Sequence, residues 1–349
     1  MRRRGRHRRI GDRWRCRSLV PRRIRPLLLL AVGVAVQVGG CGRQSPSTLD
    51  PHGPSSGRVA GLWWLLFWLA LAVFTLVALL ILVAVARRRG ADVVARRRGG
   101  EWVVIAGGVV LPALVLTAVW GISLRDMSAL GDTGRDSLTV RVVGHEWWWE
   151  VHYPAEGVVT ANEIHIPSGQ RVRFELSTAD VIHSFWVPQL APKTDLIAGQ
   201  VNVTSLEARQ PGIYRGQCAE YCGLQHANMA VLVIAEPPAA FQRWLTEQRQ
   251  AVARPSDPVA ARGLETIERN SCAACHTLRG TSANGKVGPD LTHFGSRRTL
   301  GAGVLPNTRG NVGGWIIDSQ TIKPGNHMPA QQLTPDQLQA VLRYFGTQR

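Results

Sequence analysis

The sequence predicts a multidomain membrane protein: two transmembrane helices that form an α-hairpin, then an all-β Greek-key sandwich, then a small all-α domain. Three observations support this prediction. Two long runs without a charged residue lie in the first third of the chain, a region of short alternating segments broken by turns follows them, and an amphipathic helical pattern closes the chain. At 349 residues, the chain is long enough for several folded units.

The two uncharged runs predict membrane-spanning helices at residues 59–86 and 102–124. Each run exceeds the roughly 20 residues that cross a bilayer. Two buried helices of a globular protein are the alternative, but such helices seldom stay apolar on every face for this length. The loop between the runs, residues 87–101, carries six arginines, which is typical of a cytoplasmic loop. The chain after Leu124 is therefore expected on the outer face of a bacterial cell membrane, anchored in lipid by the hairpin.

The formal net charge of +17 would suit a nucleic-acid-binding protein if it were spread over a folded surface. Instead, residues 1–40 hold twelve arginines against one aspartate, and residues 87–98 hold six arginines against one aspartate. Both clusters lie beside apolar runs, where basic residues set membrane topology, and the remainder of the chain is nearly neutral. The charge pattern therefore excludes nucleic acid as a partner.

Residues 1–40 have the pattern of a signal peptide, because an arginine-rich start precedes an apolar core that is too short to span a bilayer. The core ends in "VGGC", which resembles a bacterial lipobox and predicts that Cys41 is lipidated. An ordinary signal peptide cut nearby is the alternative. Residues 41–58 are expected to link this leader to the first span.

The stretch "CAEYCGLQHANM", residues 218–229, has the pattern of a metal site. Cys218, Cys222 and His226 follow one another at intervals of four, and Met229 comes three residues later. The surrounding region, 137–236, is the predicted β-sandwich, and His183 is expected at a strand end within it. Thiolates, imidazoles and a thioether are soft ligands that favour copper, and methionine is a poor ligand for zinc.

One cysteine suffices for a mononuclear copper site, so the second cysteine predicts two copper ions bridged by two sulfurs. One imidazole per copper would complete each site, with weak axial contacts from Met229 and from a backbone carbonyl, that of Glu220. Two alternatives stay open, a disulfide between Cys218 and Cys222 and a Cys2His2 zinc site. Both would leave Met229 without a role.

The pentapeptide "CAACH" is the C-x-x-C-H pattern of covalent haem attachment, with Cys272 and Cys275 as the thioether residues and His276 as an iron ligand. Its setting in residues 258–349 resembles a small class I cytochrome c domain. The resemblance implies Met328 as the sixth ligand and the carbonyl of Pro289 as the acceptor of the His276 ring proton. His327 and His293 are rival ligands.

The order of these features resembles subunit II of the haem-copper cytochrome c oxidases. The residues that carry the resemblance are the two spans, the motif H…C-x-E-x-C-x3-H-x2-M and "GHEWWWE" ahead of it. The fused C-terminal domain is similar to that of the caa3-type. The resemblance implies a cupredoxin fold, a binuclear copper centre called CuA, a magnesium ion at Glu220 shared with subunit I, and an aromatic cluster starting at Trp147 where electrons enter.

The function implied is electron relay rather than catalysis by residues of this chain. Electrons from an upstream cytochrome or a cytochrome bc-type complex would reach the haem c, then CuA, then subunit I, where oxygen is reduced and protons are translocated. Residues 237–257 would be a linker that tethers the haem domain. The alternatives are a CuA-bearing subunit of a nitric oxide reductase, a quinol oxidase subunit, in which the copper ligands are lost, and a membrane-tethered electron carrier.

Glu101 begins the second apolar run, and an ionisable group at the edge of a span is a candidate functional residue. The resemblance implies a glutamate near this point at the mouth of a proton pathway into subunit I. The alternative is an interfacial charge that balances Arg98.

Overall fold

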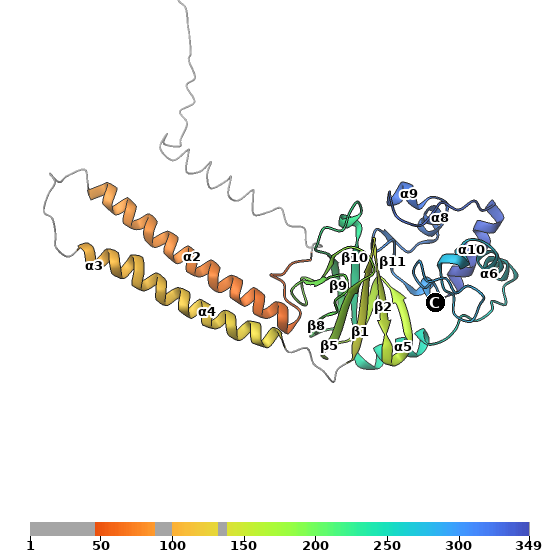
Figure 1. Ribbon diagram of the computed structural model, residues 1–349, viewed down its shortest axis with the longest axis horizontal. Coiled ribbons are helices and arrows are strands. Elements are labelled where there is room, and N and C mark those ends of the chain that lie inside the picture. The colour runs from red at the N-terminus through yellow and green to blue at the C-terminus, as the bar shows by residue number, and fades with distance from the viewer. Residues whose placement is uncertain (1–45, 88–99, 132–137, 349) are drawn as a thin grey trace, which may run out of the picture. The chain divides into compact units, whose positions relative to one another are not determined.

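The computed structural model describes residues 46–87, 100–131 and 138–348 of the chain (Figure 1). The expected signal peptide, Cys41 and most of the expected cytoplasmic loop lie outside these residues. The described residues form a helical hairpin, a two-sheet β domain and a helical C-terminal domain, so the predicted fold class is confirmed.

The hairpin consists of helix α2 (Pro54–Arg87) and a second helical segment, which contact one another. The second segment runs through α3 (Gly100–Ile105), the π-helical turn η1 (Ala106–Val110) and α4 (Leu111–Leu130). Both are long and apolar enough to cross a membrane. Large apolar side chains are exposed along both, for example Phe74 at 71% and Trp102 at 74%, as expected of surfaces that contact lipid.

Pro112 accounts for the π-helical turn in the second span. A proline ring clashes with the carbonyl four residues earlier, here that of Gly108, and the ring nitrogen has no hydrogen to donate. The wider turn η1 ends two residues before Pro112 and gives the chain room to continue as α4.

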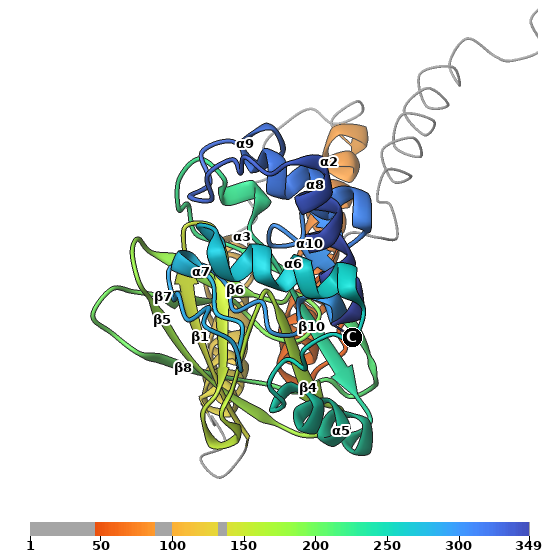
Figure 2. The same cartoon turned by 90° about the vertical axis from the view of Figure 1, so that its right-hand side faces the viewer.

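The β domain is a sandwich of two five-stranded sheets (Figure 2). The strand order in the first sheet is β3-β2-β1-β5-β8, and in the second it is β4-β10-β9-β6-β7. The strands of the first sheet are β1 (Thr139–His145), β2 (Trp148–Tyr153), β3 (Val158–Ala161), β5 (Val172–Thr178) and β8 (Asn202–Leu206). Those of the second are β4 (Glu163–Pro167), β6 (His183–Trp186), β7 (Thr194–Leu196), β9 (Gly212–Cys218) and β10 (Ala230–Glu236).

Alternating residues build the core of the sandwich. In β1, for example, Val140 and Val142 are fully buried while Arg141 between them is exposed. The same core includes Trp149, Phe174 and Phe185. The site-bearing strands β6 and β9 pair antiparallel, with Phe185 opposite Cys218, so the sheet register brings the ends of these two strands together.

The segment expected to be a linker, 237–257, contains helix α5 (Pro238–Gln248). Phe241 and Leu245 on this helix are buried in the sandwich core, and Trp244 stacks on His165 with ring centroids 4.1 Å apart. The first half of this segment therefore belongs to the β domain, whereas Val252 in the second half is buried in the core of the C-terminal domain.

The C-terminal domain packs helix α6 (Pro258–Arg269) against the last helix, α10 (Pro335–Thr347). Asp257 caps the first and Thr334 forms a capping box with Gln337 at the second. Gly263 permits the close crossing, because a Cβ there would lie 2.1 Å from the Ala340 carbonyl oxygen. The remaining elements are α7 (Cys272–Cys275), η4 (Phe294–Ser296), β11 (Thr299–Leu300), β12 (Leu305–Pro306), α8 (Arg309–Ile317) and α9 (Ser319–Ile322).

Candidate copper centre and haem site

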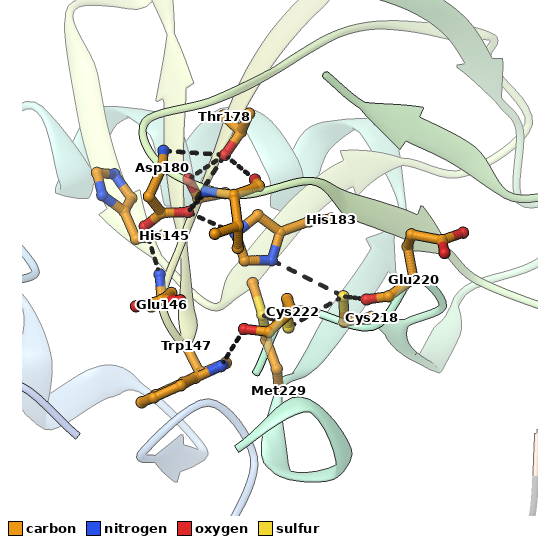
Figure 3. A network of polar contacts seen from close by, with 12 residues as sticks. His145, Glu146, Trp147, Thr178, Asp180, His183, Cys218, Glu220, Cys222 and Met229 are labelled. Carbon is orange, nitrogen blue, oxygen red and sulfur yellow. Dashed lines mark hydrogen bonds and ion pairs between the residues drawn. The ribbon is translucent and has the colours of Figure 1, made fainter. Parts of the chain in front are cut away.

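Two free cysteine thiols lie next to each other at the end of β9 (Figure 3). Cys218 is the last residue of the strand, and Cys222 lies in the loop that follows. Their sulfur atoms are 3.7 Å apart, and both side chains are buried. Gly223 lets the loop turn back, because its φ of +106° is a conformation that a residue with a Cβ rarely adopts.

Each thiol faces one imidazole. His183, the first residue of β6, has its Nδ1 atom 3.8 Å from the sulfur of Cys218. His226, the first residue of the turn η3 (His226–Asn228), has its Nδ1 atom 3.6 Å from the sulfur of Cys222. The four atoms therefore follow one another in the order nitrogen, sulfur, sulfur, nitrogen.

Two weaker donors lie beyond the thiols. The thioether sulfur of Met229 is 3.8 Å from the sulfur of Cys222, and the backbone carbonyl oxygen of Glu220 is 3.2 Å from that of Cys218. The Glu220 carboxylate points elsewhere, to the ammonium of Lys193 at 3.5 Å, and is about half exposed. Only the backbone of Glu220 therefore faces the thiols.

Asp180 fixes the orientation of the His183 ring. One carboxylate oxygen of Asp180 accepts a hydrogen bond from Nε2 of His183 at 2.8 Å, and the other accepts from the backbone N–H of Glu146 at 2.7 Å (Figure 3). Because Nε2 carries the proton, the lone pair of Nδ1 is directed at Cys218. The ring is thereby held ready to bind a metal ion.

The two thiols share their protons unequally. A hydrogen bond from Cys222 lowers the pKa of the Cys218 thiol well below its usual value. The pKa of Cys222 is raised, first because it donates that hydrogen bond to the Cys218 thiolate and second because it is buried. One negative charge is therefore favoured on the pair in the absence of a cation, and a bound cation would favour two.

This donor set fits copper. His183, Cys218 and Cys222 form the one group of three His, Cys, Asp or Glu residues, among the described parts of the chain, whose ligand atoms all lie within 4.8 Å of one another. Two thiolates, two imidazoles and a thioether within contact distance match the preferences of copper rather than those of magnesium or calcium.

Trp147 packs against the loop that carries Cys222. Its indole Nε1 donates a hydrogen bond to the backbone carbonyl of Cys222 at 2.7 Å, and its side chain is buried (Figure 3). On the other side, its ring centroid lies 5.8 Å from that of His327 in the C-terminal domain. Trp147 therefore contacts both the C-terminal domain and the candidate copper-binding loop, residues 218–229.

Cys272, Cys275 and His276 line a mostly apolar cavity in the C-terminal domain, and Met328 lines the same cavity. Nδ1 of His276 donates a hydrogen bond to the carbonyl oxygen of Pro289 at 2.7 Å, which leaves Nε2 free for a metal. Gly288 permits this contact, since a Cβ there would lie 2.6 Å from Cε1 of His276. Burial lowers the pKa of His276, which favours the neutral imidazole that ligates iron. This cavity fits a haem group.

The two rival histidines, His293 and His327, differ in whether they line the haem cavity. Nε2 of His293 interacts with the carbonyl oxygen of Gln250 at 3.0 Å, and His293 does not line the cavity. His327 does line it, but its side chain is 66% exposed and its Nε2 lies 3.7 Å from the carboxylate of Glu146. The sulfur of Met328 accepts a hydrogen bond from the indole of Trp315 at 3.1 Å.

Comparisons with known proteins match both the β domain and the C-terminal domain. Residues 156–236 match the family described as cytochrome c oxidase subunit II, periplasmic domain, and residues 260–348 match the cytochrome c family. Cytochrome c oxidase subunit 2 of Alkalihalophilus pseudofirmus is 33% identical over 317 residues, covering 88% of this chain and 92% of that protein. This chain belongs to the cytochrome c oxidase subunit 2 family. It is a subunit of a haem-copper oxidase and a partner of the other oxidase subunits.

Another relative also matches this subunit II over most of its length. The subunit 2 of Bacillus sp. strain PS3 is 32% identical, with 89% of this chain and 94% of that protein covered. Among solved structures, the periplasmic domain of subunit II from Bradyrhizobium japonicum is 28% identical over 34% of this chain and 96% of that one, with a TM-score of 0.33. The family matches and the full-length relatives support the oxidase interpretation over the nitric oxide reductase and the tethered carrier.

Some residues of this subunit II were not found from the sequence. Asp180 lies three residues before His183, and a carboxylate so close to a candidate ligand was a usable signal. Lys323 and Glu163 are buried between the β domain and the C-terminal domain, and nothing in the sequence near either residue indicates this position.

Proposed function

We propose that this subunit II takes electrons from an upstream cytochrome or cytochrome bc-type complex at a covalent haem c and delivers them through a binuclear CuA centre to subunit I. The observation that carries the proposal is the order of donor atoms, in which two thiols 3.7 Å apart each face their own imidazole. When bound, the haem and the copper pair supply reversible one-electron transfer.

Cys218 and Cys222 would hold both copper ions together, and His183 and His226 would each hold one. Met229 and the backbone carbonyl of Glu220, which lie next to the thiols, would be the weaker donors. His183 is fully buried and Met229 is 1% exposed, so water has little access to the site. A rigid, dry environment keeps the ligand geometry similar in both oxidation states, which favours fast electron transfer.

The half-exposed carboxylate of Glu220 is free to reach a magnesium ion shared with subunit I. Trp147, between the copper-binding loop and the haem domain, is the residue at which electrons enter the copper site. Because its indole bonds to the backbone of a copper ligand, it offers a short connected path.

In the haem domain, Cys272 and Cys275 would attach the haem covalently, and His276 and Met328 would hold its iron. The Pro289 carbonyl orients the His276 ring through the hydrogen bond at Nδ1. Apolar side chains around the cavity exclude water from the iron.

We expect the β domain, which is the copper domain, and the C-terminal domain, which is the haem domain, to lie on the outer face of the membrane. Residues 87–101 would then lie in the cytoplasm, and lipid would surround residues 59–86 and 102–124. The apolar, exposed side chains of the hairpin support its place in the membrane, and the six arginines of residues 87–98 support the orientation. An export-dependent reporter fused after Leu124 should be active and one fused after Arg98 should not. Cleavage of residues 1–40, lipidation of Cys41 and a role of Glu101 in proton uptake stay predictions from the sequence.

Purification of the assembled oxidase through a tag on this chain tests the proposal. The wild-type oxidase is expected to hold two more copper ions per copy of this chain than the Cys222→Ser oxidase, and one haem that stays attached to this chain under denaturing conditions. The double change Cys272→Ser and Cys275→Ser should remove the attached haem and leave the copper. A chain without covalent haem in the wild type, or copper unaffected by Cys222→Ser, would contradict the assignment.

A further inference from the structure

The haem domain is joined to the copper domain by a buried lysine. Lys323 follows α9 in the haem domain and is only 2% exposed. Its Nζ atom donates to the carbonyl oxygens of Trp147 at 2.8 Å, Asn228 at 2.7 Å and Gly301 at 2.9 Å. An ammonium group has three hydrogens to donate, and here each has one acceptor. Two of the three acceptors belong to the copper domain.

The burial of Lys323 is costly, which indicates a specific role. Removing an ammonium from water carries a large desolvation penalty, and burial lowers the pKa of Lys323 to about 7. The three carbonyl oxygens offset this penalty only while the two domains are in contact. If the domains separated, Lys323 would return to water and the carbonyls of Trp147 and Asn228 would lose their donor.

A buried glutamate makes the reciprocal contact. Glu163, at the start of β4 in the copper domain, is 3% exposed. Its Oε1 atom accepts hydrogen bonds from the backbone N–H groups of Arg298 at 2.8 Å and Thr299 at 2.9 Å, both in the haem domain. Each domain thus sends one buried charged side chain to backbone groups of the other.

These contacts bring the copper-binding loop to the wall of the haem cavity. Asn228 precedes the candidate ligand Met229, and Trp147 bonds to the backbone of Cys222. Four copper-domain residues line the cavity that also contains Cys272, His276 and Met328, and these are Glu146, Trp147, Trp148 and Asn162. The docked copper domain therefore completes the haem cavity.

We propose that Lys323 and Glu163 form a reciprocal latch that holds the haem domain against the copper-binding loop, and that both are positioning residues for electron transfer between the two sites. The proposal rests on the proposed function for its electron-transfer consequence but not for the latch itself. One electron leaves the ferrous haem and reduces the oxidised copper pair, with no proton and no third reactant. Because the latch is buried, neither domain needs to diffuse before each transfer.

Hydrogen–deuterium exchange of the purified oxidase tests the latch without reference to activity. The reporters are the amides of Arg298, Thr299 and Ala230, which all donate across the interface. Lys323→Met should speed exchange at all three by about tenfold or more, although it touches none of them, because the domains separate more often. Unchanged exchange at these amides would overturn the proposal.

Matched variants test whether the loss of any charged side chain would speed amide exchange in the same way. Lys286→Met removes an exposed lysine from the same domain and should leave the three amides unaffected. Glu163→Ala should speed exchange as Lys323→Met does, whereas Glu163→Gln keeps an acceptor oxygen and should largely restore the wild-type rate. An effect of Lys286→Met equal to that of Lys323→Met would also overturn the latch.

Photoreduction of the haem, followed at the copper absorbance, tests the consequence for electron transfer. In the wild type the internal transfer rate should be independent of viscosity and of salt, because a buried contact is little screened. In Lys323→Met it should fall about tenfold and become slower as viscosity rises, while both cofactor spectra stay unchanged. An unchanged rate would overturn the positioning role, whereas a wild-type chain that lacks either cofactor would contradict the proposed function instead.

Discussion

The indole nitrogen of Trp147 donates a hydrogen bond to the backbone carbonyl of Cys222 over 2.7 Å, so the tryptophan is bonded directly to the backbone of a candidate copper ligand. The same residue lies against the haem domain through His327. These two contacts place one aromatic side chain between the two candidate redox sites.

Trp147→Phe should therefore slow electron transfer from the haem to the copper site while leaving the copper spectrum unchanged. The change should also destabilise the copper domain by about 1–3 kcal/mol, since the buried Cys222 carbonyl loses its donor. Photoreduction of the assembled oxidase measures the first effect. Trp244→Phe is the control, because Trp244 stacks on His165 away from the copper ligands, and an equal slowing in this variant would argue against a specific path.

Asp180→Asn should weaken copper binding by about 10- to 100-fold, because the His183 ring loses the charged acceptor that orients it and raises its basicity. Competition with a copper chelator measures this on a soluble fragment of residues 138–248, which keeps α5 and its buried side chains. Glu175→Gln makes the same chemical change at a carboxylate that pairs with Arg141 and should have no effect. If both variants bind copper equally well, Asp180 does not support the site.

Glu150 predicts a specific pH dependence of stability. Hydrogen bonds from His145 and His152 lower the pKa of Glu150 from 4.5 to about 2. The folded-state pKa is below the unfolded value, so the stabilisation is fully present above pH 4.5 and is lost as the pH falls towards 2. Its size should be about 1 kcal/mol, because the carboxylate is partly screened by solvent.

Urea unfolding of the same fragment checks this dependence. Glu150→Gln should be less stable than the wild type at pH 6, and the difference should shrink as the pH falls through the window. A difference that stays constant down to the lower end of the window would show that the charge of Glu150 contributes nothing.

Met328→Ala should abolish the weak far-red absorption band that a methionine–iron bond gives in oxidised cytochromes c. His327→Ala and His293→Ala should leave this band intact, because His293 bonds to the Gln250 carbonyl and His327 is largely exposed. Absorption spectra of the oxidised oxidase distinguish the three variants. If the wild type lacks the band and Met328→Ala changes nothing, a histidine is the sixth ligand.

The local parts of both sites were accessible from the sequence because their residues lie close together along the chain. The pattern from Cys218 to Met229 and the pentapeptide ending at His276 each specify a donor set without knowledge of the fold. His183 needed the strand prediction as well, because only the pairing of β6 with β9 brings it to Cys218.

The contacts between domains could not be predicted in this way. Lys323 and Glu163 are ordinary charged residues in sequence, and their burial depends on backbone groups far along the chain. Helix α5 is a different case. Phe241, Trp244 and Leu245 have the spacing of an amphipathic helix, and this pattern within residues 237–257 was a usable signal against a plain linker.

We expect two thiols and two imidazoles to bind a pair of copper ions that share one electron. Electron paramagnetic resonance of the copper-loaded fragment 138–248, together with its copper content, distinguishes such a pair from a single ion. Two copper ions per chain and the hyperfine pattern of one unpaired electron spread over two equivalent copper nuclei are expected, and both should be lost in Cys222→Ser. One copper ion per chain with the hyperfine pattern of a single nucleus would show that the site is not binuclear.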